Sequence, residues 1–337
     1  MTQNVYFGFD VAPLLAAENP EEIPILAAQA FGQLIETNFA ERAEALADEI
    51  SRKRPHLIGL QEVALFRIQS PGDLIVGGSA PAETVLFDHL EILRAALAAR
   101  GLEYAVAGKV QNADVELPML ASAEPLAFDD IRLTDFDVVL ARADVSVSNV
   151  AQANYAAKLF VPSLGVEIPR GFVALDARLT SGRSYRFVNT HLEDVPFEEI
   201  QQAQASELLA ALASERMPVV LVGDFNSPAL DGATYQFLMT QGFVDAWTRN
   251  AAQDAGPGLT WGHDPGLRNE TVSFTMRLDL ILVRQAPEAA PSGDLAFVLA
   301  DVWGDEPADR TETGLWPSDH AGVTAELHIP TLLRVRK

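Results

Sequence analysis

The sequence predicts an α/β fold built around a mixed β-sheet. Short runs rich in apolar and β-branched residues alternate along the chain with alanine-rich segments that have the spacing of amphipathic helices. The runs at 172–179 and 184–189 are separated by four residues that include Gly182, which is typical of a β-hairpin. Two neighbouring antiparallel strands favour a mixed sheet over a doubly wound parallel one.

Taken in order, the expected elements fill most of the chain. Strands are expected at residues 4–9, 57–61, 172–179, 184–189, 219–222, 278–283 and 322–328. Helices are expected at residues 39–54, 84–100, 197–215 and 233–241. We interpret 11–38, 69–82, 111–130 and 250–273 as inserts or long loops that wall a pocket. One domain is expected over residues 1–330, followed by a short basic tail at 331–337.

Composition and charge narrow the functional classes. Of the 337 residues, 48% are hydrophobic and 21% are charged, which is enough apolar material for a large core. The absence of cysteine excludes disulfides, zinc–thiolate sites and thiol nucleophiles. A formal net charge of −23 disfavours general affinity for nucleic acid, although a bound metal reverses the field locally. No apolar run approaches the roughly 20 residues of a transmembrane helix.

Polar side chains stand at the ends of the most apolar runs. They are Glu62 after 57–61, His191 after 184–189, Asp224 and Asn226 after 219–222, and Asp319 and His320 before 322–328. When several buried strands end in such residues, their polar side chains lie close together at one end of the sheet. Hydrolysis of a phosphate ester needs a carboxylate for a hard cation, a base, and donors for developing negative charge. No Gly-x-Ser-x-Gly elbow supports a serine hydrolase.

These motifs, in this order, resemble the endonuclease/exonuclease/phosphatase superfamily, which includes deoxyribonuclease I. The matching segments are Gln3-Asn4, Gln61-Glu62, Asn189-Thr190-His191, Gly223-Asp224-Phe225-Asn226, Arg277-Leu278-Asp279 and Ser318-Asp319-His320. They span nearly the whole chain. The resemblance implies a four-layered α/β sandwich of the deoxyribonuclease I type. Two mixed β-sheets would pack face to face, with helices outside and the active site at one end.

The resemblance also implies a divalent-metal site. Asn4, Glu62 and Asp319 match the residues that hold the metal in the family, usually Mg²⁺, with Mn²⁺ or Ca²⁺ as substitutes. Since Mg²⁺ keeps several waters and takes only one or two protein carboxylates, a sparse set of protein ligands is expected. The alternatives are that Asn4 is an ordinary strand-edge amide and that Glu62 caps the following segment.

Five further residues match catalytic positions of the family. His191 resembles the histidine that contacts a phosphate oxygen or protonates the leaving group, and Asp224 and Asn226 resemble the pair that aligns the attacking water. Asp279 resembles the carboxylate that orients the last histidine, His320, which serves as general base. Without their motifs, Asp224 and Asn226 are interpreted as turn formers, and His191 as a structural histidine.

Two residues are candidates for substrate binding on looser grounds. Arg170 precedes a strand and either clamps a phosphate through its guanidinium or forms a surface salt bridge. His263 lies beside Trp261 in the 250–273 segment, and it is either a substrate contact or a structural residue.

The chain departs from the family pattern in three places. Only three residues precede Asn4, so the start is either trimmed, for example by loss of a leader, or carries a short first strand. His56 holds a position at which relatives often carry Asp. The 11–38 segment separates the first strand from its helix more widely than in nucleases, and we expect it to act as a lid.

The expected function is a Mg²⁺-dependent phosphodiesterase or phosphatase whose substrate is a small-molecule or lipid-headgroup phosphate ester. The alternative is a nuclease with the same chemistry, which a continuous basic groove would favour. A non-catalytic binding protein that retains the fold is a remote third. The sequence leaves open the substrate and the oligomeric state. It also leaves open whether the protein is cytoplasmic or exported with a leader absent from this chain.

Overall fold

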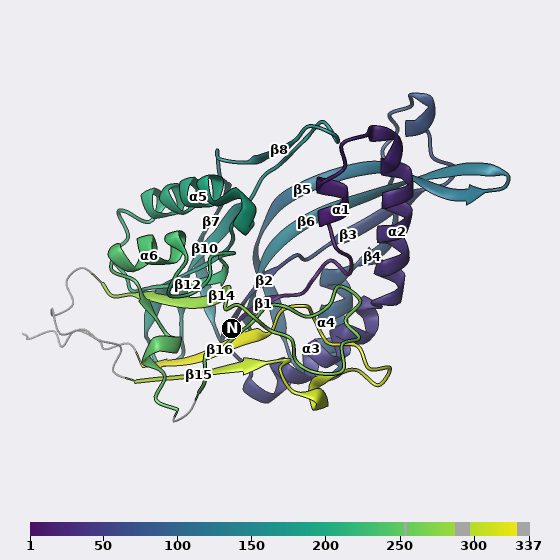
Figure 1. Ribbon diagram of the computed structural model, residues 1–337. Coiled ribbons are helices and arrows are strands. Elements are labelled where there is room, and N and C mark those ends of the chain that lie inside the picture. Colours follow the sequence, from purple (N-terminus) through teal and green to yellow (C-terminus); the bar gives the residue numbers. More distant parts are fainter. Residues whose placement is uncertain (253–254, 287–296, 329–337) are drawn as a thin grey trace, which may run out of the picture.

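Two mixed β-sheets pack face to face at the centre of the computed structural model, which describes residues 1–252, 255–286 and 297–328 (Figure 1). Within these ranges the first sheet has eight strands. Its order is β15 (Phe297–Trp303), β16 (Gly322–His328), β1 (Thr2–Asn4), β2 (Leu57–Gln61), β6 (Leu126–Arg142), β3 (Leu65–Gln69) and β4 (Thr84–Asp88), with β5 (Tyr104–Ala123) paired to β6.

The second sheet has six strands in the described part of the chain. Its order is β13 (Val244–Asp245), β14 (Asp279–Arg284), β12 (Val219–Asp224), β11 (Ser184–His191), β10 (Gly171–Arg178) and β7 (Ser146–Asn154). A separate small hairpin consists of β8 (Leu159–Val161) and β9 (Val166–Ile168). The pairs β1–β2 and β11–β12 are parallel and the other pairs are antiparallel, so both sheets are mixed.

Helices cover the outer faces of both sheets. Helices α3 (Phe39–Lys53) and α4 (His89–Ala99) pack on the first sheet, and α5 (Glu198–Ala211) and α6 (Ala233–Thr240) pack on the second. Helices α1 (Ala12–Leu15) and α2 (Ile23–Glu36) lie beside the long β5–β6 hairpin (Figure 1). Short 3₁₀ helices are η1 (Pro20–Glu22), η2 (Leu74–Val76), η3 (Val195–Phe197), η4 (Trp247–Arg249) and η5 (Pro307–Asp309).

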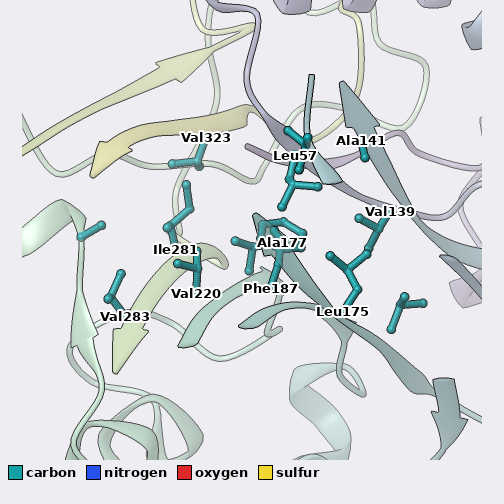
Figure 2. Packing of buried hydrophobic residues seen from close by; sticks show 14 of the residues in the cluster. Leu57, Val139, Ala141, Leu175, Ala177, Phe187, Val220, Ile281, Val283 and Val323 are labelled. Atoms are coloured by element: carbon teal, nitrogen blue, oxygen red, sulfur yellow. The ribbon is translucent and has the colours of Figure 1, made fainter. Parts of the chain in front are cut away.

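Alternation of side chains along the strands explains the four layers. In β2, Leu57 packs in the cluster between the sheets (Figure 2). Its neighbour Ile58 packs against α3 and α4. In β12, Val220 faces the first sheet and Val219 faces α5 and α6. Successive side chains on a strand point to opposite faces, so these apolar strands are buried on both sides. The predicted four-layered sandwich is confirmed.

One buried amide crosses the interface between the sheets. The Asn189 Oδ1 atom on β11 accepts a hydrogen bond from Gln61 Nε2 at 2.6 Å. Its Nδ2 atom donates to the carbonyl oxygens of Leu60 and Val138, at 3.0 and 3.2 Å. A Cβ atom on Gly59 would lie 2.3 Å from Asn189 Oδ1, so only glycine leaves room for this contact. The amide therefore ties β11 to β2 and β6.

The predicted hairpin is confirmed, whereas two predicted elements have wrong boundaries. Strands β10 and β11 pair antiparallel from Phe172 with Thr190 to Arg178 with Ser184. The helix expected at 84–100 begins only at His89, because residues 84–88 pair with β3 as β4 and Asp88 caps the helix. The strand expected at 4–9 ends at Asn4, and the chain turns at Tyr6, which has a φ of 60°.

The segments interpreted as inserts or loops contain regular structure. Residues 11–38 include α1, η1 and α2. Residues 111–130 belong to β5 and β6, whose hairpin extends outward past α2 (Figure 1). The predicted basic tail at 331–337 lies outside the described residues. No helix in the described ranges is long and apolar enough to cross a membrane.

We predict that Gly59→Ala destabilises the protein by about 1–3 kcal/mol, because the new methyl group would overpack the interface and displace Asn189. Urea unfolding measures the change. The matched control is Gly32→Ala in α2, where a Cβ meets no atom within 4 Å. That control should be neutral or stabilising by up to about 1 kcal/mol, since alanine favours a helix. Equal stability of both variants would contradict the role given to Gly59.

Candidate active site

The ends of the parallel strands bring the candidate residues together. Strands β1 and β2 end at the same edge of the sandwich as β11 and β12. Strands β14 and β16 run antiparallel to β12 and β1, so they begin at this edge. The predicted residues that gather here are Asn4, Glu62, His191, Asp224, Asn226, Asp279, Asp319 and His320. Their proximity is a finding, and their individual roles stay predictions.

Asp224 is the central residue of this cluster. Its Oδ2 atom accepts a hydrogen bond from Asn4 Nδ2 at 3.2 Å and lies 3.6 Å from His191 Nε2 and 3.7 Å from His320 Nε2. Its Oδ1 atom accepts from the backbone N–H of Asn226 at 2.9 Å. Burial, opposed by His320, raises the pKa of Asp224 to about 7. One carboxylate thus contacts both histidines.

Close backbone geometry positions Asp224. Gly223 has a φ of 151°, and a Cβ there would lie 1.9 Å from the Thr190 carbonyl oxygen. No other residue fits between β11 and β12 at this point. Asn226 and Glu62 adopt left-handed backbone conformations, with φ values of 50° and 59°. Such conformations cost roughly 1–3 kcal/mol each and concentrate at functional sites.

His320 is paired with Asp279. Its Nδ1 atom lies 2.8 Å from Asp279 Oδ2, and both side chains are buried. Burial alone lowers the pKa of His320, but Asp279, Asp319 and Asp224 outweigh it and raise the pKa well above its usual value. Because Nδ1 is bonded to Asp279, the Nε2 atom faces the centre of the site. This is the arrangement of a histidine held in one orientation by a carboxylate.

His191 has the opposite electrostatic setting. Its Nδ1 atom lies 3.1 Å from Arg170 Nη1, and its Nε2 atom lies 3.2 Å from Asn226 Nδ2. Burial, with smaller effects from Arg170 and His320, lowers the pKa of His191 well below its usual value. A guanidinium and an amide NH₂ group only donate, so both ring nitrogens of His191 face donors. The Nε2 atom also lies 3.6 Å from Asp224 Oδ2.

Glu62 and Asp319, two of the residues predicted to hold a metal, provide carboxylate oxygens in one place. Asn4 instead directs its Nδ2 atom at Glu62, while its Oδ1 atom accepts a hydrogen bond from the Tyr6 backbone N–H at 2.9 Å. Glu62 accepts through Oε1 from Asn4 Nδ2 and through Oε2 from the Phe7 backbone N–H, both at 2.9 Å. Burial first, then repulsion by Glu62 and Asp224, raises the pKa of Asp319 to about 7 despite His320 and Arg42. A cation would relieve this repulsion, and carboxylate and amide oxygens are the ligands that Mg²⁺ prefers. The donor set therefore fits a hard divalent cation.

A second group of potential ligands overlaps the catalytic residues. Asp224, Asp279 and His320 offer ligand atoms that lie within 4.8 Å of one another. However, His320 Nδ1 is already bonded to Asp279, and a histidine nitrogen is a poor ligand for Mg²⁺. Asp224, Asp279 and His320 are therefore weaker metal candidates than Glu62 and Asp319.

The two substrate-binding candidates differ in position. Arg170 is not a surface residue: only 13% of its side chain is exposed, and it lies 3.5 Å from Glu193 and 3.9 Å from Asp135. His263 stacks on Trp316 at 4.2 Å and contacts Asn269 and Ser273. The structure joins Arg170 to the site through His191 and shows no direct bond from the His263 ring to the catalytic residues among those described.

Arg42 is a site-supporting residue that sequence reasoning missed. It is fully buried, and its guanidinium donates to the carbonyl oxygens of Val5, Tyr6, Thr37 and Pro317. These contacts anchor the chain after Asn4 and before Asp319. The available signal was an arginine on the buried face of the helix at 39–53, three positions after Phe39.

Comparisons with known proteins agree with this geometry. The model of the endonuclease/exonuclease/phosphatase family matches residues 1–320. A family protein from Leptotrichia buccalis C-1013-b is 16% identical, with a TM-score of 0.54 over 85% of this chain and 92% of that one. A mannosyl-6-phosphatase from Bacteroides thetaiotaomicron VPI-5482 is 17% identical, with a TM-score of 0.52 over 86% and 92%.

A third similar structure is D. rerio TDP2 complexed with single-strand DNA product, which is 19% identical, with a TM-score of 0.52 over 87% of this chain and 93% of that one. No curated protein sequence matches the chain. At these identities the structural likeness shows the fold alone.

We predict that Asp279→Asn lowers the pKa of His320, because the substitution removes the charge that lies nearest to the imidazole. In metal-free buffer the wild-type ring should stay protonated above neutral pH, and the variant ring should lose its proton at lower pH. An NMR titration of the histidine ring signals measures both. Asp176→Asn, at a residue paired with Arg186 away from the site, is the control. An unchanged His320 titration in Asp279→Asn would remove the pair from the site.

Proposed function

Since this chain belongs to the endonuclease/exonuclease/phosphatase family, whose members are hydrolases of phosphoester bonds that depend on a divalent metal, we propose that it is a Mg²⁺-dependent phosphodiesterase or phosphatase. Its substrate would be a small-molecule or lipid-headgroup phosphate, cut by in-line attack of water. The observation that carries this proposal is the convergence of the Asp279–His320 pair, Asp224 and Glu62 at one edge of the sandwich.

Each residue of the site has a separate role in the proposed reaction. His320 takes a proton from the attacking water, while Asp279 holds the ring and stabilises its positive charge. Asp224 and Asn226 align the water. His191 and Arg170 donate to the phosphoryl oxygens, where negative charge develops in the transition state.

The proposed metal would be held by Glu62 and Asp319, and Asn4 would position Glu62 through its hydrogen bond to Oε1. When bound, Mg²⁺ supplies Lewis-acid polarisation of a phosphoryl oxygen.

A nuclease is the second candidate, because a similar structure holds a single-strand DNA product. The net charge of −23 weighs against it, since long-range repulsion opposes the binding of a polyanion. A non-catalytic role finds no support in the site, where every matched residue is retained. An activity panel with bis-p-nitrophenyl phosphate, sphingomyelin, inositol phosphates and plasmid DNA, each with Mg²⁺, separates the candidates.

We predict that His320→Ala lowers kcat on bis-p-nitrophenyl phosphate by about 10²–10⁴-fold, which is the usual contribution of a general acid or base. Steady-state assays with Mg²⁺ measure the loss. The control is His56→Ala, because His56 is exposed and precedes β2 at the end opposite Glu62. Near wild-type turnover of the His320→Ala enzyme would show that the mechanism is wrong.

We predict that Glu62→Gln raises the Mg²⁺ concentration for half-maximal activity by about tenfold or more, because a neutral amide is a weaker ligand than a carboxylate. Metal titration of turnover measures this concentration. The exposed Glu103, changed to glutamine, is the matched control and should leave the titration curve in place. If Glu62→Gln and wild type require the same metal concentration, Glu62 is not a ligand.

A further inference from the structure

An apolar cavity of about 140 Å³ lies beside the candidate active site. Helices α1 and α2 form one wall, strands β5 and β6 form another, and the β8–β9 hairpin contributes Leu159, Leu164 and Ile168. Phe7, Phe9, Phe31 and Phe66 add aromatic surface. These walls include the 11–38 and 111–130 segments that the sequence distinguishes as inserts.

The charged residues of the lining connect the cavity to the site. Its lining within the described residues is apolar except for Asp135, Arg170 and Glu193, and Arg170 contacts both acids. The same guanidinium lies 3.1 Å from His191 Nδ1. Thus the polar end of the cavity is formed by the residue that is proposed to bind the phosphate.

A second contact fixes the cavity next to the proposed metal ligand. The backbone N–H of Phe7 donates to Glu62 Oε2 at 2.9 Å, and the side chain of Phe7 lines the cavity. Glu62 and Arg170 lie on different sheets, yet each is linked to a residue of the same lining. The cavity therefore adjoins the proposed catalytic residues through Phe7 and Arg170.

The chemistry of the lining selects an occupant. Small-molecule sites are concave and lined mainly by apolar and aromatic side chains, with a few polar groups that fix the orientation of the ligand. A second phosphate would lose its hydrogen bonds with water here and would meet the carboxylates of Asp135 and Glu193. A hydrocarbon group that extends from a phosphate at Arg170 would instead bury apolar surface.

We propose that this cavity binds the hydrocarbon group of the substrate, which is a phosphate ester of a hydrophobic alcohol whose phosphate contacts Arg170 and His191. This inference rests on the proposed phosphoesterase function and names its substrate class. The inserted segments would then determine which alcohol group is bound, while the residues at the strand ends would hydrolyse the phosphate ester.

The test is the binding of methyl, butyl, hexyl and octyl phosphate to the wild-type protein with Mg²⁺ by isothermal titration calorimetry. Affinity should rise by up to about fourfold for each added methylene until the cavity is full. The heat capacity change of binding should become more negative with chain length, because more apolar surface is buried. Affinity that is independent of chain length would overturn the inference.

A matched pair of variants locates the hydrocarbon. Ala30→Phe fills the cavity from α2 and should reduce the affinity for octyl phosphate to that for methyl phosphate. Ala28→Phe places the same side chain on the same helix outside the lining and should keep the chain-length dependence. Ala113→Phe fills the cavity from β5 and gives a second reading if Ala30→Phe does not fold. Retained chain-length dependence in a folded cavity-filling variant would contradict the proposal.

Hydrolysis of methyl p-nitrophenyl phosphate separates the two proposals. If the wild-type protein hydrolyses this ester and alkyl phosphates bind with equal affinity, the phosphoesterase function stands and only the cavity assignment fails. If no phosphate ester in the panel is hydrolysed with Mg²⁺, the proposed function fails and the substrate class fails with it.

Discussion

The close approach of the two sheets is the constraint on which the rest of the structure depends. Asn189 hydrogen-bonds from β11 across the core to β2 and β6, and Gly59 leaves the space for it. Glu62 follows the partner residue Gln61 directly, and His191 follows Asn189 by two positions. One buried amide therefore sets the separation between a carboxylate from the first sheet and a histidine from the second. Without it, the buried carbonyl groups of Leu60 and Val138 would lose this hydrogen-bond partner from the second sheet.

Opposite electrostatic settings distinguish the two histidines that this edge brings together. Three carboxylates raise the pKa of His320, whereas burial and the adjacent Arg170 lower the pKa of His191. The Asp224 carboxylate lies within 3.7 Å of both rings, so it contacts the histidine with the raised pKa and the histidine with the lowered pKa. His320 is therefore the more basic of the two rings, which suits the residue that is proposed to take a proton from water. The distribution of charge, rather than the net charge of the chain, determines this property.

The sequence predicted the strand ends well and the surrounding scaffold less well, for a physical reason. Glu62, Asp224 and His320 each adjoin an apolar strand, so a few neighbouring residues identify their setting. By contrast, β5 mixes buried and exposed positions over 20 residues without regular alternation, because its outer part leaves the sheet, and no strand was predicted there. Arg42 was missed because the carbonyl groups that it binds, including that of Pro317, are remote in sequence. Local patterns identify chemistry at strand ends, whereas partners from distant segments need the fold.

The same distinction bears on how the protein would select its substrate. The residues at the strand ends lie on the two-sheet core, which is rigid because it is buried on both faces. The apolar cavity is built from additions to that core, namely α1, α2, the outer β5–β6 hairpin and the β8–β9 hairpin. Such additions tolerate changes in sequence more readily than a packed core does, so a family can keep its chemistry and alter its substrate. Arg170 belongs to both parts, since it contacts His191 on one side and lines the cavity on the other. When the hydrocarbon group of a substrate occupies the cavity, Arg170 would therefore hold the attached phosphate beside the catalytic residues.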